Sequence, residues 1–479
     1  MNTDELFCKK VIDFFGEMNK IPRGSGNEKG VSDYLVGFAK ERGLEVFQDE
    51  ALNVLIRKEA TPGYENKQGV IIQGHMDMVC EKNQGVEHDF LKDPIDLIFE
   101  GDYIRANGTT LGADDGVAVA MALAILDSDT IPHPSLEVLI TTDEEVGMFG
   151  ARAFDTDLLR GKLLLNIDSE VEGVFTAGCA GGARAEVSIP LNLKKPSFKT
   201  GYKLIVEGLK GGHSGVDINK ERANANQILA RSLKHIGAYT EIEVGGLWGG
   251  SKDNAIPRDS FAYIFCDDKT GLDKALYALN GELGAEYSAT DPKIKVRAEE
   301  GADCEEIFEK ESLERVLGAI LLIPCGIVNM SGSIKGLPET SNNIGSVRTE
   351  GGEFKLVCAL RSAVESRKEY LKTLIACGAE LAGGKAEFRG DYPAWEYKES
   401  SYIRPLVCGV YERLYNKKAV VDIIHAGLEC GLLGGKKSDL DMISMGPDIL
   451  DIHSPDERLS ISSTERTFRL VCEILKEVE

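Results

Sequence analysis

The sequence predicts an α/β domain with a mixed, largely parallel sheet, interrupted by a separate α+β domain. Over residues 1–185, short apolar runs alternate with helical patterns, as in sheets whose parallel strands are connected by helices. From about residue 186, apolar and polar residues alternate, which is typical of antiparallel strands with one face in water. The first pattern returns near residue 390. We therefore expect a discontinuous domain, 1–185 with 390–479, and an inserted domain, 186–389.

The composition limits the classes of function. The 479 residues are 43% hydrophobic, enough for more than one core. A formal net charge of −23 argues against a nucleic-acid partner, because no excess of cations could neutralise phosphates. The 11 cysteines include no Cys-x-x-Cys pair, as expected of free thiols in a reducing compartment. With no apolar run of transmembrane length and no signal peptide, we expect a cytoplasmic protein without a membrane partner.

Periodicity predicts the elements at the start of the chain. Apolar residues at helical spacing indicate a helix over residues 5–20 and a second over 30–42, separated by the glycine-rich break PRGSGNEKG. The stretch GLEVFQDEALNVLIRKEA indicates two strands. The run VIIQGHMDMV, residues 70–79, then has the composition of a buried strand with polar groups at its carboxyl end.

His75 and Asp77 follow this strand on the same face, because side chains alternate along a strand. Asp77 can therefore fix the tautomer of His75, as carboxylates do beside metal-binding histidines. An isolated His-x-Asp is also typical of a buried histidine that is satisfied by a carboxylate. A metal site needs further ligands from elsewhere in the chain.

Carboxylates precede the next predicted helix. In GTTLGADDGVAVAMALAILD, residues 108–127, apolar residues from Val117 onward form a helical face, and Asp114 and Asp115 stand just before it. Such carboxylates can simply cap a helix. Two adjacent aspartates between glycines exceed what a cap requires, and a bound metal would keep both ionised.

Two further strands end in acidic residues. LEVLITTDEEVG, residues 136–147, ends in Asp143, Glu144 and Glu145, and KLLLNIDSE ends at Asp168. Open α/β sheets place ligands at the carboxyl ends of their strands. A Glu-Glu pair alone is usually surface charge. Three strands that end in His, Glu and Asp, with aspartates before a helix, together indicate a metal centre.

The inserted domain and the carboxyl-terminal part complete the pattern. Strands are predicted at ARAEVSIPLNL, YKLIVEGL, FAYIFCDD and KIKVRAEE, and helices over 221–236 and 312–323. Later, IRPLVCGVYERLY and TERTFRLVCEILKEV predict helices, with strands and loops at AVVDIIHAGLECG and DMISMGPDI. No internal repeat is evident in the sequence.

The order of the motifs resembles a known family. GHMDMV, GTTLGADDG, TTDEEVG, LLNID, KGGHSG, HAGLECG and IHSPDE lie between residues 74 and 457. They are similar to the co-catalytic zinc exopeptidases, a family that includes carboxypeptidases, aminoacylases and dipeptidases. The resemblance implies a di-zinc catalytic domain with an inserted lid and dimerisation domain. It implies hydrolysis of unblocked dipeptides, Xaa-His among them, by a water that two zinc ions and a glutamate activate.

Two alternatives remain at this point. One is a related amidohydrolase, a tripeptidase, an aminoacylase or a carboxypeptidase, whose motifs would overlap at the metals and differ in the lid. The other is a non-catalytic zinc-dependent binding protein, which would have no reason to retain Glu144.

The resemblance implies five metal ligands: His75, Asp114, Glu145, Asp168 and His453. Asp114 would bridge two ions, with His75 and Asp168 in one site and Glu145 and His453 in the other. Nitrogen and oxygen ligands without a thiolate suit catalytic zinc, and could also accept manganese or cobalt. The peptide bond after Asp114 is expected to be cis.

One position departs from the pattern of the nearest relatives. The chain has GADDG where GADNG is expected, so Asp115 adds a negative charge next to the bridging ligand. We expect this change to alter metal preference or pH dependence while leaving the ligand set intact.

The resemblance also assigns catalytic roles. Glu144 would be the general base that takes a proton from the attacking water and returns it to the leaving amine. Asp77 would orient His75. His213, in KGGHSG, matches a histidine that reaches the partner subunit's active site and stabilises the oxyanion. A homodimer follows from that role.

Two substrate-binding residues are implied in the inserted domain. Asn254, in SKDNAIP, and Arg361, in LVCALRSAVES, correspond to lid groups that hold the substrate's amide and terminal carboxylate. Arg361 could equally form a surface ion pair. His425 and Glu429, in HAGLECG, match a motif that lines the site, but the resemblance gives them no role.

Overall fold

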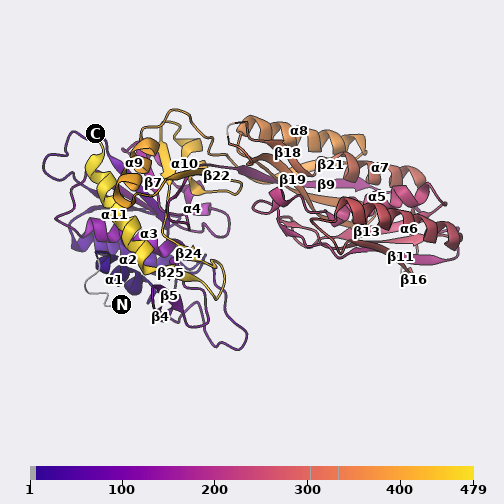
Figure 1. Ribbon diagram of the computed structural model, residues 1–479, viewed down its shortest axis with the longest axis horizontal. Helices are drawn as coiled ribbons and strands as arrows, with labels where there is room; N and C mark the ends of the chain where they lie inside the picture. The colour runs from indigo at the N-terminus through magenta and orange to yellow at the C-terminus, as the bar shows by residue number, and fades with distance from the viewer. Residues whose placement is uncertain (1–6, 303, 333) are drawn as a thin grey trace. The chain divides into compact units, whose positions relative to one another are not determined.

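The computed structural model describes residues 7–302, 304–332 and 334–479, and the chain divides into two compact units. Unit 1 comprises Met1–Cys179, Tyr397–Ile423 and Leu428–Glu479, and unit 2 comprises Ala180–Glu396 and Ile424–Gly427. The first and the last described segments of the chain, indigo and yellow in Figure 1, both belong to unit 1. Unit 2 is therefore an insertion in unit 1.

Unit 1 contains an eight-stranded sheet in the order β1-β2-β6-β3-β7-β23-β8-β22. The central strands β6, β3, β7 and β23 run parallel. Strand β1 pairs antiparallel with β2, β2 with β6, and β8 with β23. The predicted mixed sheet is therefore confirmed, with its parallel strands at the centre. The strands are β1 Glu45–Gln48, β2 Val54–Lys58, β3 Val70–His75, β6 Leu136–Thr141, β7 Leu163–Asn166, β8 Val174–Cys179, β22 Val420–Ile424 and β23 Asp441–Ser444.

Helices pack against this sheet. They are α1 Lys9–Met18, α2 Lys29–Glu41, α3 Ala113–Leu126, α4 Phe149–Ala153, α9 Ile403–Tyr415, α10 Glu429–Lys436 and α11 Ile461–Glu477. Residues 5 and 6 of the first predicted helix lie outside the described residues. Helix α3 is buried on nearly every side, not on one face, because it packs against β3, α1 and α11. None of the described helices combines the length and the apolar character that a membrane span requires.

The parallel register brings three strand ends to one edge of the sheet. His75 of β3 pairs with Thr141 of β6, and Gln73 of β3 pairs with Asn166 of β7. The acidic segments that follow β6 and β7 therefore begin beside His75. This edge is where an α/β sheet places its ligands.

A small four-stranded sheet carries the last predicted ligand. Its order is β24-β25-β5-β4, with β4 Leu97–Glu100, β5 Tyr103–Ala106, β24 Ile449–Leu450 and β25 Arg458–Ser460. Strands β24 and β25 are antiparallel, and the loop 451–457 that joins them contains His453.

Unit 2 contains a sheet in the order β16-β11-β15-β13-β19-β20-β9-β21, in which β18 also pairs with β19. Its strands alternate buried and more exposed residues, as β11 does along its length, and its apolar residues form a core of their own. The strands are β9 Gly181–Pro190, β11 Gly201–Glu207, β13 Glu243–Gly249, β15 Ser260–Phe265, β16 Lys295–Glu300, β18 Gly326–Met330, β19 Pro338–Glu350, β20 Glu353–Ser362 and β21 Lys385–Tyr392.

The same βαββαβ arrangement occurs twice in unit 2. The first comprises β11, α5 (Ala225–Gly237), β13, β15, α6 (Lys269–Glu286) and β16; the second comprises β9, α7 (Lys310–Leu322), β19, β20, α8 (Glu365–Leu381) and β21. In each, the first strand lies between the third and the fourth. The two arrangements join where β13 pairs with β19. The structure thus contains a repeat that the sequence does not reveal.

Candidate active site

The five predicted ligands of unit 1 lie around the carboxylate of Asp114. Nε2 of His75 is 3.2 Å from Oδ1 of Asp114, and Nε2 of His453 is 3.1 Å from Oδ2. Oδ1 of Asp168 lies 3.7 Å from His75 Nε2, and Oε2 of Glu145 lies 3.0 Å from His453 Nε2. Asp114 therefore stands between two groups, each with one histidine and one further carboxylate.

These donors fit divalent cations. Ligand atoms of His75, Asp114 and Glu145 lie within 4.8 Å of one another, and so do those of His75, Asp115 and Asp168. Imidazole nitrogens and carboxylates without a thiolate are typical ligands of catalytic zinc and similar metals. Oε1 of Glu145 is buried and has no hydrogen-bond partner among the described residues. Such an unsatisfied buried oxygen is suited to a cation.

The cluster carries more negative charge than its histidines neutralise. Burial lowers the pKa of His75, but the carboxylates of Asp114, Asp168 and Asp77 outweigh it and hold the pKa well above its ordinary value. Hydrogen bonds to Asp114 and Glu145 raise the pKa of His453 to about 11. Burial raises the pKa of Asp168 to about 6. Groups in this cluster bind protons tightly, and cations at the same place would satisfy the same carboxylates.

Asp77 connects several parts of this cluster. Its Oδ1 lies 3.3 Å from Nδ1 of His75 and accepts a hydrogen bond from the backbone N–H of Glu144 at 3.0 Å. Its Oδ2 accepts one from the N–H of Glu145 at 3.2 Å and one from the hydroxyl of Ser25 at 2.8 Å. One carboxylate thus fixes both the imidazole of His75 and the turn that carries the two glutamates.

Glu144 lies in the turn directly after β6. Its carbonyl oxygen accepts hydrogen bonds from the backbone N–H groups of Gly147 and Met148. Burial raises the pKa of its carboxyl group well above the ordinary value, and the negative charges of Asp168 and Glu429 act in the same direction. A carboxyl group with a raised pKa next to a metal cluster is suited to accept and return a proton.

The backbone at the start of α3 has the predicted special geometry. The peptide bond between Asp114 and Asp115 is cis, which confirms the expectation. Neither residue has helical dihedral angles, so the regular helix begins after them. Asp115 is 1% exposed, and its Oδ2 accepts a hydrogen bond from the N–H of His75 at 3.2 Å. The additional charge of this sequence is therefore buried against the first ligand.

A buried polar network below the cluster was not predicted. Oε2 of Glu429, the first residue of α10, accepts hydrogen bonds from Gln73 and Thr141, both at 2.6 Å. Asn166 donates to Gln73 at 2.6 Å. Burial raises the pKa of Glu429 to about 8. The sequence signals were Gln73, a polar residue within an otherwise apolar strand, and Glu429, which belongs to the motif HAGLECG but had no role assigned to it.

The glycine-rich break PRGSGNEKG also contributes residues that sequence reasoning missed. Ser25 binds Asp77 as described above. The N–H of Gly26 donates to Oδ1 of Asp143 at 3.0 Å, and Oε1 of Glu28 accepts from the N–H of Asp143 at 3.1 Å. These bonds hold the acidic turn from the side of residues 25–28. Charged residues inside a glycine-rich break were the signal that could have indicated this role.

In unit 2, the side chains of His213 and Arg361 and the backbone of His425 lie around Gly215. A Cβ atom on this glycine would lie 2.7 Å from the carbonyl oxygen of His425, 3.1 Å from Cε1 of His213 and 3.2 Å from Nε of Arg361. Nε2 of His425 is 2.7 Å from the hydroxyl of Ser341. Burial, followed by the charge of Arg361, lowers the pKa of His425 to about 4.

His213 is held in a defined tautomer. Its Nδ1 accepts hydrogen bonds from the backbone N–H groups of Gly215 and Val216, both at 3.2 Å. In the neutral ring the proton is therefore on Nε2, and burial lowers the pKa of His213, as does Arg361. His213 is thus a neutral hydrogen-bond donor through Nε2.

Arg361 and Asn254 lie close to His213 in unit 2. Arg361 donates to the hydroxyl of Tyr392 at 3.1 Å, and its buried Nε has no hydrogen-bond partner among residues 7–302, 304–332 and 334–479. Within these residues, this nitrogen therefore takes no part in the surface ion pair considered from the sequence. The carbonyl oxygen of Asn254 accepts a hydrogen bond from the N–H of Ser214 at 2.8 Å, and Asn254 itself is exposed.

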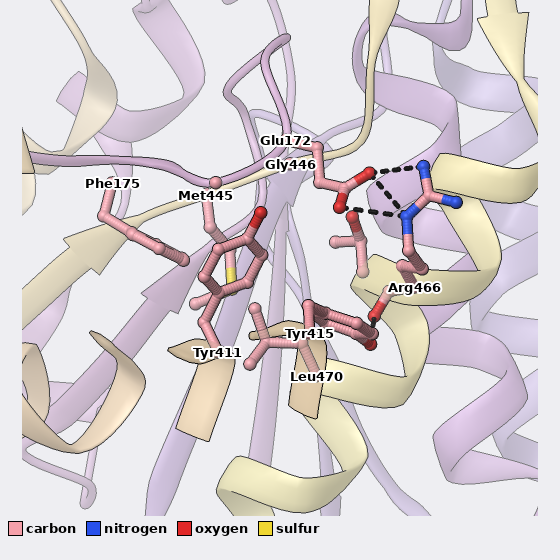
Figure 2. Close-up of a pocket in the computed structure, with 10 residues that line it drawn as sticks. Glu172, Phe175, Tyr411, Tyr415, Met445, Gly446, Arg466 and Leu470 are labelled. Carbon is pink, nitrogen blue, oxygen red and sulfur yellow. Dashed lines mark hydrogen bonds and ion pairs between the residues drawn. The ribbon is translucent and has the colours of Figure 1, made fainter. Parts of the chain in front are cut away.

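A small internal cavity in unit 1 lies apart from this chemistry. Its volume is about 10 Å³, and its lining includes Phe175, Tyr411 and Tyr415. Figure 2 shows its polar side, where Glu172 pairs with Arg466 through hydrogen bonds of 2.9 and 2.8 Å. This volume is sufficient for about one water molecule, so a dipeptide does not bind there.

Comparison with known proteins gives consistent matches over the whole chain. Residues 71–477 match the family described as peptidase family M20/M25/M40. The chain is 38% identical to the cytosol non-specific dipeptidase of Escherichia coli (strain K12), over 99% of this chain and 98% of that protein. The structure matches that of the aminoacylhistidine dipeptidase from Vibrio alginolyticus with a TM-score of 0.93 and 36% identity, covering 100% and 98% of the two chains. The aminopeptidase PepT of Bacillus cereus, with a TM-score of 0.56, 17% identity and 99% of each chain covered, shares the fold.

Proposed function

Because this chain belongs to peptidase family M20/M25/M40, we propose that it is a metal-dependent dipeptidase that hydrolyses unblocked dipeptides, Xaa-His dipeptides among them. The observation that carries the proposal is the arrangement of two histidines and two carboxylates on either side of Asp114. The named dipeptidases of Escherichia coli and Vibrio alginolyticus, similar over nearly the full chain, support the substrate class.

The proposed ligand set is that of two cation sites. His75, Asp168 and Asp114 would hold one ion, and Glu145, His453 and Asp114 the other, in agreement with the distances given above. Zinc is the metal we propose first, with manganese and cobalt as alternatives. When bound, two such cations polarise the scissile carbonyl and lower the pKa of an attacking water.

The chain itself supplies the proton transfer. Glu144, whose pKa is raised by burial, takes the proton from the attacking water and passes it to the leaving amine nitrogen. Asp77 keeps His75 in one tautomer and, through the N–H of Glu144, holds the turn of the base in place. Asp77 thus has a positioning role, and Glu144 has the chemical one.

Unit 2 is proposed to act as a lid that holds the substrate. His213 would donate its Nε2 proton to the oxyanion, a role that its tautomer supports. Arg361 would pair with the terminal carboxylate of the dipeptide, since its buried Nε has no hydrogen-bond partner among the described residues. Asn254 would bind the amide of the substrate.

We further propose that the protein is a cytoplasmic homodimer in which His213 of one protomer serves the site of the other. Mixing a His213→Asn variant with a Glu144→Gln variant tests this arrangement. If His213 acts across the dimer, the mixture recovers activity that neither variant has alone. If the two variants remain inactive together although they form mixed dimers, His213 serves the site of its own chain.

The substrate class is tested with a panel of unblocked dipeptides, tripeptides and N-acylated amino acids. The proposal expects cleavage of dipeptides, including Xaa-His, that is lost with chelator and restored by zinc. Faster cleavage of tripeptides or of N-acylated amino acids would instead indicate one of the related amidohydrolases. Binding of zinc without cleavage of any member of the panel would indicate a binding protein.

A further inference from the structure

We propose that Arg23 and Glu457 are positioning residues that hold together the three backbone segments of the metal cluster, an inference that rests on the proposed metallopeptidase function. Both side chains are charged, and each residue is only 2% exposed. Neither is among the proposed ligands. Buried charges are rare unless they are paired or hydrogen-bonded, so the bonds that these two groups make indicate what they do.

Glu457 binds the backbone that precedes and carries the bridging ligand. Its Oε2 accepts hydrogen bonds from the N–H groups of Leu111 at 2.7 Å and Gly112 at 3.0 Å. Its Oε1 accepts from Ala113 at 2.8 Å and from Asp114 at 3.3 Å. One carboxylate thus satisfies four consecutive backbone donors, those of residues 111–114, in the segment that leads into the regular part of α3.

Glu457 also fixes the position of His453. Both belong to the loop 451–457. In this loop the N–H of Glu457 donates to the carbonyl oxygen of Ser454 at 3.1 Å, and the hydroxyl of Ser454 donates to the carbonyl oxygen of Asp451 at 2.7 Å. Because the carboxylate of this loop binds the N–H of Asp114, the loop is held where Nε2 of His453 meets Oδ2 of Asp114.

Arg23 binds the same region from the other side. It donates to the carbonyl oxygens of Met76 at 3.0 Å, Asp77 at 3.4 Å and Gly112 at 2.5 Å. Met76 and Asp77 directly follow His75. The guanidinium group therefore connects the segment of the first ligand with the segment of the bridging ligand, a task for which its planar set of donors is suited.

The two charged groups meet at Gly112. Its N–H donates to Glu457 and its carbonyl oxygen accepts from Arg23. A Cβ atom at Gly112 would lie 2.4 Å from Nη2 of Arg23, and one at Gly116 would lie 2.6 Å from it. The guanidinium group thus occupies the space in which side chains at the two glycines of GADDG would stand.

The chain offers a matched control at the other end of the same sheet. Glu137 is 5% exposed and accepts hydrogen bonds from the N–H groups of Arg160 and Gly161, both at 2.7 Å, and from Arg57 at 3.0 Å. It is the second residue of β6, four residues before Thr141, or roughly 13 Å along a strand. Glu137→Gln therefore changes the same kind of bond away from the cluster.

The experiment compares Glu457→Gln, Glu457→Asp and Arg23→Lys with Glu137→Gln in the full chain. Zinc affinity is measured by competition with a chromophoric chelator, and the Tm of each metal-free protein is measured alongside. We expect Glu457→Gln and Arg23→Lys to weaken zinc binding at least tenfold, in the range of changes to groups that orient metal ligands. Glu457→Asp, which keeps the charge, should recover part of that loss, and Glu137→Gln should change zinc affinity less than twofold even where it lowers the Tm.

The outcomes separate this inference from the proposed function. If the unaltered protein binds no zinc, the proposed metallopeptidase function fails. If it binds zinc and the Glu457 and Arg23 variants bind it equally well, the positioning role is wrong. If Glu137→Gln weakens zinc binding as much as Glu457→Gln does, the effect is one of general stability, and the positioning role is again overturned. If Glu457→Gln does not fold, the zinc affinities of Glu457→Asp and Arg23→Lys test the positioning role by the same criteria.

Discussion

The acidic cluster of unit 1 and the basic cluster of unit 2 differ in how their side chains are held. In unit 1, Asp77 alone accepts hydrogen bonds from two backbone N–H groups and a hydroxyl. In unit 2, Arg361 makes a hydrogen bond to Tyr392, and Asn254 is exposed. The first cluster is held by its own backbone in advance of any ligand, as the proposed metal site requires, whereas the second contains the donors that we propose the substrate engages.

The two clusters also differ in the charged groups that they contain. Unit 1 gathers carboxylates that raise the pKa of His75 and His453. Unit 2 gathers His213, His425 and Arg361, and burial, followed by the charge of Arg361, lowers the pKa of both histidines. Changes in unit 1 should therefore affect metal binding or the chemical step, and changes in unit 2 should affect the substrate while the metal stays bound.

The largest effect is expected at Glu144. Glu144→Gln keeps the size of the side chain and removes the proton acceptor, so kcat should fall about 10³-fold, within the range of general acid–base catalysis. Metal content per chain, measured by elemental analysis, should stay the same. Retained turnover would exclude Glu144 as the base, and loss of metal would show that it acts as a ligand.

His213 allows a comparison of two variants. His213→Asn keeps an acceptor near the position of Nδ1 but removes the Nε2 donor, so kcat should fall about 100-fold, as when a donor to an oxyanion is lost. His213→Gln keeps a donor near the position of Nε2 and should retain more activity. Steady-state kinetics of the two variants measure the difference. Equal rates would mean that the donor is not required.

At Arg361 we expect a smaller effect that depends on the substrate. Arg361→Lys keeps the charge but loses the planar pair of donors, so kcat/KM for a dipeptide should fall about 30-fold, mainly through KM. A dipeptide amide, which lacks the terminal carboxylate, serves as the control and should show nearly the same kcat/KM in both proteins. An equal loss with the amide would assign Arg361 to another part of the substrate.

The smallest effect concerns pH and His425. Its folded pKa of about 4 lies below the ordinary 6.5, so the unfolded chain binds a proton first as the pH falls. The stability that the neutral ring contributes is present above about pH 6.5 and is lost as the pH falls toward 4.

When the pH is lowered from 7.5 to 5.5, His425 should lower the unfolding free energy of unit 2 by about 1 kcal/mol. The His425→Gln variant should not show this decrease. Both tryptophans, Trp248 and Trp395, belong to unit 2, so fluorescence during urea unfolding reports on it. The same pH dependence in both proteins would mean that His425 is not the group responsible.

The sequence predicted those parts of the site that local patterns determine. His75, Glu144, Glu145 and Asp168 each follow an apolar strand, and the parallel register of β3, β6 and β7 brings those strand ends together. The roles of Glu144 and His453, in contrast, were implied by the family resemblance. Periodicity alone could not have distinguished Glu144 from Glu145.

Other features depend on contacts between distant segments. Glu457 accepts from Leu111, which is 346 residues away in the chain, and Glu429 accepts from Gln73, 356 residues away. No local pattern predicts such pairs. The two βαββαβ arrangements of unit 2 also escaped prediction, because the same strand order can be built from unrelated sequences when only the apolar alternation is retained.

The central claim is that two cations at Asp114 enable the chain to hydrolyse dipeptides. The most direct test removes metal with a chelator, returns zinc in measured equivalents, and follows the release of histidine from an Xaa-His dipeptide. We expect no release without metal and a rate that rises until about two equivalents per chain are bound, as the shared ligand implies. Release of histidine at an undiminished rate from metal-free protein, or no release at any zinc level, would contradict the central claim.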